Sequence, residues 1–235
     1  MSGKKAGRVI GLAASAGGLN ALIQVISKLP GDLPAALVLV QHLEPTHRSM
    51  LASILDRRTD LLVTEARDGD VLADGHAYVA PPNRHLLVNV DRSLSLTQSE
   101  LVHFVRPSAD LLFESLAASC KERAIAVVLS GSGIDGSLGV TAVKKMGGTV
   151  IAQDEASADF FGMPGAAIET GAVDLVLPLD EISPALMRLT MLGEELVLFR
   201  NEGGRVAALS DWCPHRGARL SLGLCEFKGT VTCPY

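Results

Sequence analysis

The chain has 235 residues and a formal net charge of −5. Hydrophobic residues make up 48% of it, but aromatic residues only 4%. No apolar run approaches the ~20 residues of a membrane-spanning helix, and no signal peptide follows the basic start, so we predict a cytoplasmic protein without membrane insertion. The acidic charge balance argues against nucleic acid as a main partner.

Strand-sized apolar runs alternate with helical patterns through most of the chain. Strands are predicted at residues 8–14, 35–41, 62–66, 124–130, 149–153 and 174–178, and helices at residues 19–29, 50–56, 109–119, 140–146 and from 183 onward. Three short runs at residues 77–80, 86–90 and 94–96 are split by turn residues, which predicts antiparallel strands beside the main sheet. The fold class predicted is therefore α/β: a doubly wound, mostly parallel sheet with an inserted antiparallel hairpin.

The pattern changes near residue 190. Residues 196–200 and 206–209 are predicted strands around a glycine-containing turn, and they form an all-β segment too short to bury a core of its own. We therefore predict two parts, an α/β catalytic domain at residues 1–189 and a short β segment at residues 190–235.

Three polar residues follow predicted strands. Ser15 follows the first strand, His42 the second, and Asp135 lies in the loop after residues 124–130. In an open α/β sheet, sites form outside the carboxyl ends of the strands, so these side chains should converge on one edge. A serine, a base and an orienting carboxylate are the groups that nucleophilic acyl transfer needs. The residues thus predict a serine hydrolase, with Ser15 as nucleophile, His42 as base and Asp135 orienting the imidazole.

Backbone donors for an oxyanion are also predictable. Because Ser15 opens a helix, the N–H of Ala16 is free to face a developing negative charge, and the loop that begins at Ser132 offers a second donor.

Each of these residues also has an ordinary structural interpretation. A serine before a helix is commonly an N-cap, a histidine after a strand a turn residue, and an aspartate among glycines an Asx-turn former. Other histidines compete for the role of base: His47, His76, His85 and His103.

A binding module of a different class is the main alternative. The glycine loops at residues 17–18 and 131–136 could cradle phosphates at strand–helix junctions. The sequence lacks G-x-G-x-x-G and a P-loop Lys-Ser/Thr pair, and an acidic ribose-binding residue is missing after the second strand. The residues by themselves leave a non-catalytic nucleotide-binding module open.

Seven short motifs resemble one known family. They are Ala14-Ser-Ala-Gly-Gly, Val40-Gln-His, Ala77-Tyr-Val-Ala-Pro-Pro, Arg106-Pro-Ser-Ala-Asp, Leu129-Ser-Gly-Ser-Gly-Ile-Asp-Gly, Ala152-Gln-Asp-Glu-Ala-Ser and Phe161-Gly-Met-Pro. In this order, over roughly residues 8–188, they are similar to the catalytic domain of chemotaxis protein-glutamate methylesterases of the CheB type.

This resemblance implies a function and a partner. It implies hydrolysis of γ-glutamyl methyl esters on the cytoplasmic helices of methyl-accepting chemoreceptors, in some members glutamine deamidation, and no cofactor for either reaction. It also implies a substrate region with Arg106, Asp154 and Met163, and a receptor methyltransferase as a further partner.

The sequence departs from the family pattern in two places. Only about seven residues precede the first strand, so no phospho-receiver domain is expected in front of it, and Ser132 stands where the family usually has Met.

The four cysteines are unevenly spaced. Cys120 lies alone in a helical pattern, which predicts a buried thiol. Cys213-Pro-His-Arg-Gly-Ala followed by Cys233-Pro-Tyr resembles a Rieske [2Fe–2S] motif, which implies Cys213, His215 and Cys233 as three metal ligands. The fourth ligand would be the next residue, where the sequence ends, so we expect a partial Rieske-like segment. A [2Fe–2S] cluster completed by another chain, in an iron–sulfur-associated fusion protein, is the alternative. Cys225 has no place in this motif.

Overall fold

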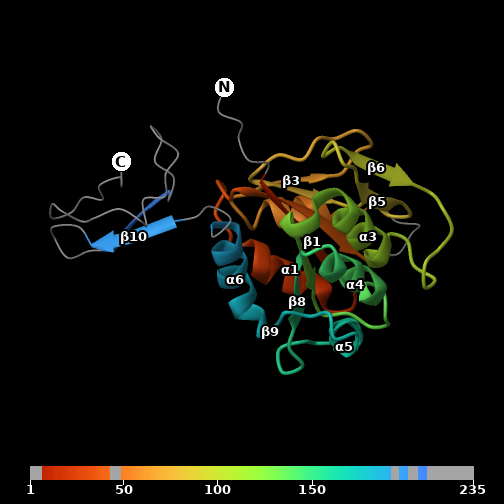
Figure 1. The fold of residues 1–235 in the computed structure, drawn as a ribbon. Helices are drawn as coiled ribbons and strands as arrows, with labels where there is room; N and C mark the ends of the chain where they lie inside the picture. The colour runs from red at the N-terminus through yellow and green to blue at the C-terminus, as the bar shows by residue number, and fades with distance from the viewer. Residues whose placement is uncertain (1–6, 43–48, 192–195, 201–205, 211–235) are drawn as a thin grey trace. The chain divides into compact units, whose positions relative to one another are not determined.

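A computed structural model of the chain describes residues 7–42, 49–191, 196–200 and 206–210 (Figure 1). The chain divides into two compact units, Met1–Thr190 and Met191–Tyr235, which are treated separately below.

The first unit is built on a seven-stranded sheet with the order β3-β4-β2-β1-β7-β8-β9, in which every pairing is parallel. The strands are β1 (Arg8–Ala14), β2 (Ala35–Gln41), β3 (Leu62–Glu65), β4 (His76–Val79), β7 (Ala124–Val128), β8 (Thr149–Gln153) and β9 (Leu175–Leu177). The predicted α/β fold with a mostly parallel sheet is confirmed.

Strand β1 is the point where the strand order reverses. It pairs with β2 up to Ala14↔Gln41 and with β7 up to Ala13↔Val128. The chain then leaves three adjacent strands at the same edge of the sheet, which is where open α/β sheets place their ligands.

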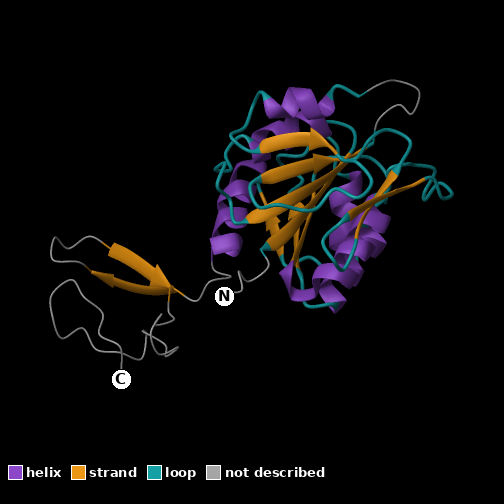
Figure 2. Cartoon of the chain, turned by 90° about the horizontal axis from the view of Figure 1, so that it is seen from above, coloured by secondary structure: helices purple, strands orange, loops and turns teal. Residues whose placement is uncertain are grey.

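Helices cover both faces of this sheet (Figure 2). The helices are α1 (Gly18–Ile26), α2 (Leu51–Asp56), α3 (Ala109–Cys120), α4 (Ser137–Lys145), α5 (Gly162–Glu169), α6 (Leu179–Met191) and the short 3₁₀ helix η1 (Lys121–Arg123). Side chains of β1 alternate between the two cores: Ile10 and Leu12 pack with α1, α2 and α6, whereas Val9 and Ala13 pack with α3, α4 and α5. Burial on both faces explains why β1 and β2 read as continuous apolar runs.

Two sequence expectations need correction. The run at residues 77–80 is not part of the antiparallel insertion, because β4 lies between β2 and β3 in the parallel sheet. Only β5 (His85–Val88) and β6 (Leu94–Thr97) form the antiparallel hairpin. Helix α6 begins at Leu179, before the predicted start at Ser183. The Ser183 hydroxyl does not cap the helix but donates to the carbonyl of Val25 at 2.7 Å.

In the second unit, β10 (Leu196–Arg200) and β11 (Val206–Ser210) pair antiparallel, which confirms the two strands predicted there. No helix in the described part of either unit has the length and apolar character required to cross a membrane.

Candidate active site

Ser15 lies in the tight turn between β1 and α1. Its N–H donates to the carbonyl of Ser130 at 3.0 Å, and its own carbonyl accepts from the N–H of Gly18 at 2.8 Å. Gly17 has a φ of 73°, a left-handed conformation that glycine adopts without strain. The Ser15 hydroxyl makes no hydrogen bond within the described part of the chain, and its side chain is partly exposed.

His42 and Asp135 form a direct hydrogen-bonded pair. His42 Nε2 lies 2.9 Å from Asp135 Oδ2, with 12% of the histidine side chain and 3% of the aspartate side chain exposed. The N–H of His42 donates to the carbonyl of Ala14 at 3.1 Å, so the ladder between β2 and β1 continues one residue past the strands.

The start of helix α3 holds the Asp135 carboxylate. Its oxygens accept from the Ser108 hydroxyl at 2.8 Å, from the N–H of Ala109 at 2.6 Å and from the N–H of Asp110 at 3.2 Å. Burial by itself would raise the pKa of Asp135, but the hydrogen bonds from His42 and from the start of α3 outweigh it, and the pKa lies below its ordinary value. Asp135 is therefore ionised at neutral pH.

An ionised carboxylate fixes the tautomer of His42. Because Asp135 can only accept, the hydrogen is on Nε2, and Nδ1 keeps its lone pair for a proton. Ser15 and His42 follow facing residues of two paired strands, and such strands are ~4.8 Å apart. No hydrogen bond joins the Ser15 hydroxyl to the His42 ring in the described part of the chain, and such contacts commonly tighten only when substrate is bound.

Two backbone donors remain available near Ser15. Among the described residues, the N–H groups of Ala16 and Ser132 have no hydrogen-bond acceptor, while the carbonyl of Ala16 accepts from the Ser130 hydroxyl at 2.8 Å. A reacting carbonyl oxygen could therefore be stabilised from either loop.

The three predicted substrate-region residues have different surroundings. Met163 is buried, and a side chain on Gly131 would collide with its thioether and lie 3.0 Å from Ser15 Cβ, so Met163 packs close to Ser15. Arg106 Nε and Nη2 donate to Asn83 Oδ1 at 2.8 and 2.7 Å.

Asp154 accepts from the hydroxyl and the N–H of Ser157 at 2.6 and 3.0 Å. The known contacts of Arg106 and Asp154 thus hold loops in place, and a substrate-binding role for all three residues stays a prediction.

The competing histidines lie elsewhere. His76 contacts the carbonyl of Asp74 at 3.1 Å, His103 contacts Asp110 at 3.1 Å, and His47 is outside the described residues. His85 is fully buried: its Nδ1 accepts from the N–H of Ser108 at 3.1 Å, and its Nε2 donates to the carbonyl of Glu100 at 3.0 Å.

Sequence reasoning did not predict the supporting roles of three residues: Gln41, His85 and Ser108. Ser108 precedes the predicted helix and is a signal for an N-cap, a role that its bond from the Leu111 N–H at 3.4 Å supports. Gln41 lies in a motif with His42, and His85 was a candidate base, but no local signal shows their supporting contacts, which are to backbone atoms.

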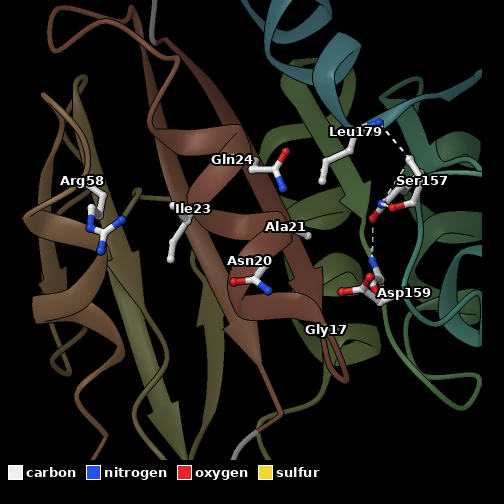
Figure 3. A pocket seen from close by; sticks show the side chains of 11 residues that line it. Gly17, Asn20, Ala21, Ile23, Gln24, Arg58, Ser157, Asp159 and Leu179 are labelled. Carbon is white, nitrogen blue, oxygen red and sulfur yellow. Dashed lines mark hydrogen bonds between the residues drawn. The ribbon is translucent and has the colours of Figure 1, made fainter.

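A cavity of about 260 Å³ is lined by Gly17 and by residues of α1 (Figure 3). Asn20 and Gln24 line it from α1, and Ser157 and Asp159 from the loop after β8. A side chain on Gly17 would meet the Asp159 carboxylate, so the start of α1 already faces a negative charge.

The second glycine loop is similarly occupied. The N–H of Gly139, in the first turn of α4, donates to the buried carboxylate of Asp110 at 2.8 Å. Because carboxylates occupy the helix starts next to both glycine loops, these loops do not favour a phosphate, and the nucleotide-binding alternative gains no support.

Of the cysteines, Cys120 is buried with 4% exposed, which confirms the predicted buried thiol. The predicted metal ligands Cys213, His215 and Cys233 lie outside the described residues, as does Cys225. Within the described ranges, no group of three or more His, Cys, Asp or Glu residues could hold a metal ion.

Comparison with known proteins separates the two parts of the chain. The family model described as CheB methylesterase matches residues 10–186, and the model described as Rieske [2Fe-2S] domain matches residues 174–235. The crystal structure of the Thermotoga maritima CheB methylesterase catalytic domain matches with a TM-score of 0.75 and 38% identity, covering 78% of this chain and 98% of that one.

Curated relatives carry one name. A protein-glutamate methylesterase/protein-glutamine glutaminase of Symbiobacterium thermophilum is 41% identical over 181 residues, covering 77% of this chain and 50% of its own length. A second protein of this name, from Pseudomonas aeruginosa, is 42% identical over 186 residues, covering 77% and 52%. The chain thus spans about half the length of these relatives.

Proposed function

The chain belongs to the CheB methylesterase family, and from this premise we propose that it is a protein-glutamate methylesterase with Ser15, His42 and Asp135 as its catalytic residues. The observation that carries the proposal is the His42–Asp135 pair, 2.9 Å apart at the sheet edge from which Ser15 also emerges. The names of the curated relatives support the same reaction and add glutamine deamidation as a second activity.

The proposed reaction proceeds through an acyl-enzyme. The Ser15 hydroxyl attacks the ester carbonyl carbon while His42 Nδ1 takes its proton, and Asp135 stabilises the resulting imidazolium. The tetrahedral oxyanion faces the N–H groups of Ala16 and Ser132. Its collapse breaks the bond to the methoxy oxygen, which leaves as methanol with the proton from His42.

Water completes the cycle. His42 takes a proton from a water molecule that attacks the Ser15 ester, and then returns a proton to the serine oxygen, releasing the glutamate side chain as a carboxylate. With glutamine as substrate, the same acylation step would release ammonia instead of methanol. No step requires a metal or an organic cofactor.

The partners follow from the substrate. We propose the cytoplasmic helices of methyl-accepting chemoreceptors as the protein substrate, which places the reaction in the cytoplasm. A receptor methyltransferase, which would form the esters that this chain removes, is the opposing enzyme.

The C-terminal match needs separate treatment. A Rieske cluster takes two cysteines and two histidines, and the motif here supplies three of these residues, Cys213, His215 and Cys233. These three residues would hold such a cluster together with a fourth ligand, and no step of the proposed chemistry is assigned to it.

The test is the variant Ser15→Ala, assayed on a methylated receptor fragment by release of methanol. Removing the nucleophile should lower kcat by on the order of 10⁴-fold or more while the free energy of unfolding stays the same. The control Ser53→Ala removes an exposed hydroxyl on α2 that donates to the carbonyl of Met50. It should retain wild-type activity. Hydrolysis at the wild-type rate by Ser15→Ala would disprove the proposed mechanism.

A further inference from the structure

A buried glutamine links the two proposed reacting residues. Gln41, at the end of β2, is 6% exposed, and its Nε2 donates to the carbonyl of Ser15 at 2.7 Å and to the carbonyl of His42 at 3.2 Å. We infer that Gln41 is a positioning residue that fixes the separation between nucleophile and base. This inference rests on the proposed function of Ser15 and His42.

The orientation of the Gln41 amide is determined by its partners. Both are carbonyl oxygens, which can only accept, so the amide nitrogen must face them. The other end, Oε1, is buried next to Gly18 at the start of α1, and it has no hydrogen-bond partner among the described residues. The specific contribution of Gln41 therefore lies in its two N–H groups.

Gly18 leaves room for this arrangement. A side chain at Gly18 would collide with Gln41 Oε1 and with the Cβ of Ala14. The absence of a side chain at Gly18 thus allows the close approach of the Gln41 side chain.

No other side chain in the described part of the chain hydrogen-bonds both Ser15 and His42. Ser15 is tied to the β7 side by its N–H, through the carbonyl of Ser130, and to the β2 side by its carbonyl, through Gln41. The last ladder bond between the strands, from the N–H of His42 to the carbonyl of Ala14, lies one residue before Ser15. Without Gln41, the serine turn would lose its hydrogen bond to the strand that carries the base.

The test replaces the amide by groups of similar length. Gln41→Met keeps the volume but has no N–H donor. Gln41→Glu has no donor when ionised and only one O–H donor when protonated, so it cannot make both hydrogen bonds. A misplacement of the nucleophile by a fraction of an ångström to 1 Å should lower kcat by about 10- to 100-fold while KM is unchanged, because substrate contacts remain.

The same loss should appear in the rate at which a fluorophosphonate labels Ser15. This probe requires the activated serine but no receptor.

The control is Ser183→Ala on α6. It also removes a buried hydrogen bond, to the carbonyl of Val25, but contacts none of the site residues. It should lower the free energy of unfolding with an unchanged labelling rate, which separates destabilisation from positioning.

Three outcomes would overturn the inference, and they are distinguishable. Labelling of Gln41→Met and Gln41→Glu at the wild-type rate would overturn it alone. Failure of both variants to fold would assign Gln41 to folding rather than positioning. A wild-type chain that is not labelled at Ser15 would overturn the proposed function, and the inference with it.

Discussion

The carboxylate end and the serine end of the site differ in how they are held. Asp135 accepts from His42, Ser108, Ala109 and Asp110, and it is 3% exposed. Ser15 is held through its backbone, and its hydroxyl has no hydrogen bond among the described residues.

This difference matches what the proposed mechanism requires of each group. A carboxylate that orients a base works best when it is ionised and immobile, which hydrogen bonds from a helix start provide. A nucleophile must move toward the substrate carbonyl, so its position is best fixed through the peptide groups on either side. The comparison predicts that changes at the carboxylate end alter both stability and activity, whereas changes to the Ser15 hydroxyl alter activity alone.

The largest expected effect at the carboxylate end comes from Asp135→Asn. The amide N–H₂ would face a donor wherever it points, since both carboxylate oxygens accept hydrogen bonds, and it cannot select the His42 tautomer. We expect kcat to fall by on the order of 10⁴-fold and the free energy of unfolding by ~1–3 kcal/mol. Steady-state assays and urea unfolding measure the two effects.

The comparison makes Ser15→Ala the natural control for that variant. It should lose a similar amount of activity with little loss of stability. An Asp135→Asn protein as stable as the wild type would show that the carboxylate end is not the rigid half of the site.

A smaller effect is expected from Ser108→Ala. This change removes one of the hydrogen bonds to Asp135 and the side-chain cap of α3. The cap is worth ~1 kcal/mol of stability. If ~1.4 kcal/mol of the hydrogen bond from Ser108 to Asp135 stabilises the transition state, its loss should lower kcat about tenfold.

A matched control lies on the same helix. The Ser119 hydroxyl donates to the carbonyl of Val88 at 2.7 Å, away from Asp135, so Ser119→Ala should lose stability but keep its activity. Equal activity losses in both variants would mean that α3 affects the site through stability alone.

The comparison also separates what the sequence could predict from what it could not. The main strands and the polar residues after them could be predicted from the sequence, because apolar runs and the residues that end them are local patterns. The place of β4 in the sheet could not be predicted from the sequence. His76–Val79 is a four-residue run, and its parallel partners, β2 and β3, are set by contacts distant in the chain.

The supporting contacts of the site show the same limit. Ser108 could be read as a helix cap, but nothing local shows that its hydroxyl reaches a carboxylate 27 residues later. Gln41 was part of a motif with His42, yet its role depends on the carbonyl of Ser15, 26 residues away. Residue types at strand ends are thus predictable, and the groups that hold them in place are found only in three dimensions.

The smallest expected effect is on stability and comes from His85, which accepts a hydrogen bond from the N–H of Ser108 at the carboxylate end. Burial lowers the pKa of His85 below its ordinary value of about 6.5, against the opposing effect of the Glu100 carbonyl. Between the folded pKa and about 6.5, the unfolded chain binds a proton that the folded chain does not. The free energy of unfolding contributed by His85 therefore falls as the pH drops through that range, by at most ~1.4 kcal/mol per pH unit.

The variant His85→Gln removes this titration. It should be less stable than the wild type at pH 7.5, because it cannot both accept from the Ser108 N–H and donate to the Glu100 carbonyl in the same geometry. The difference between the two proteins should shrink as the pH drops below about 6.5, because the wild-type chain then progressively loses the contribution of the neutral imidazole. Urea unfolding of both proteins at several pH values measures that difference directly. A difference that does not change with pH would mean that protonation of His85 is not linked to folding.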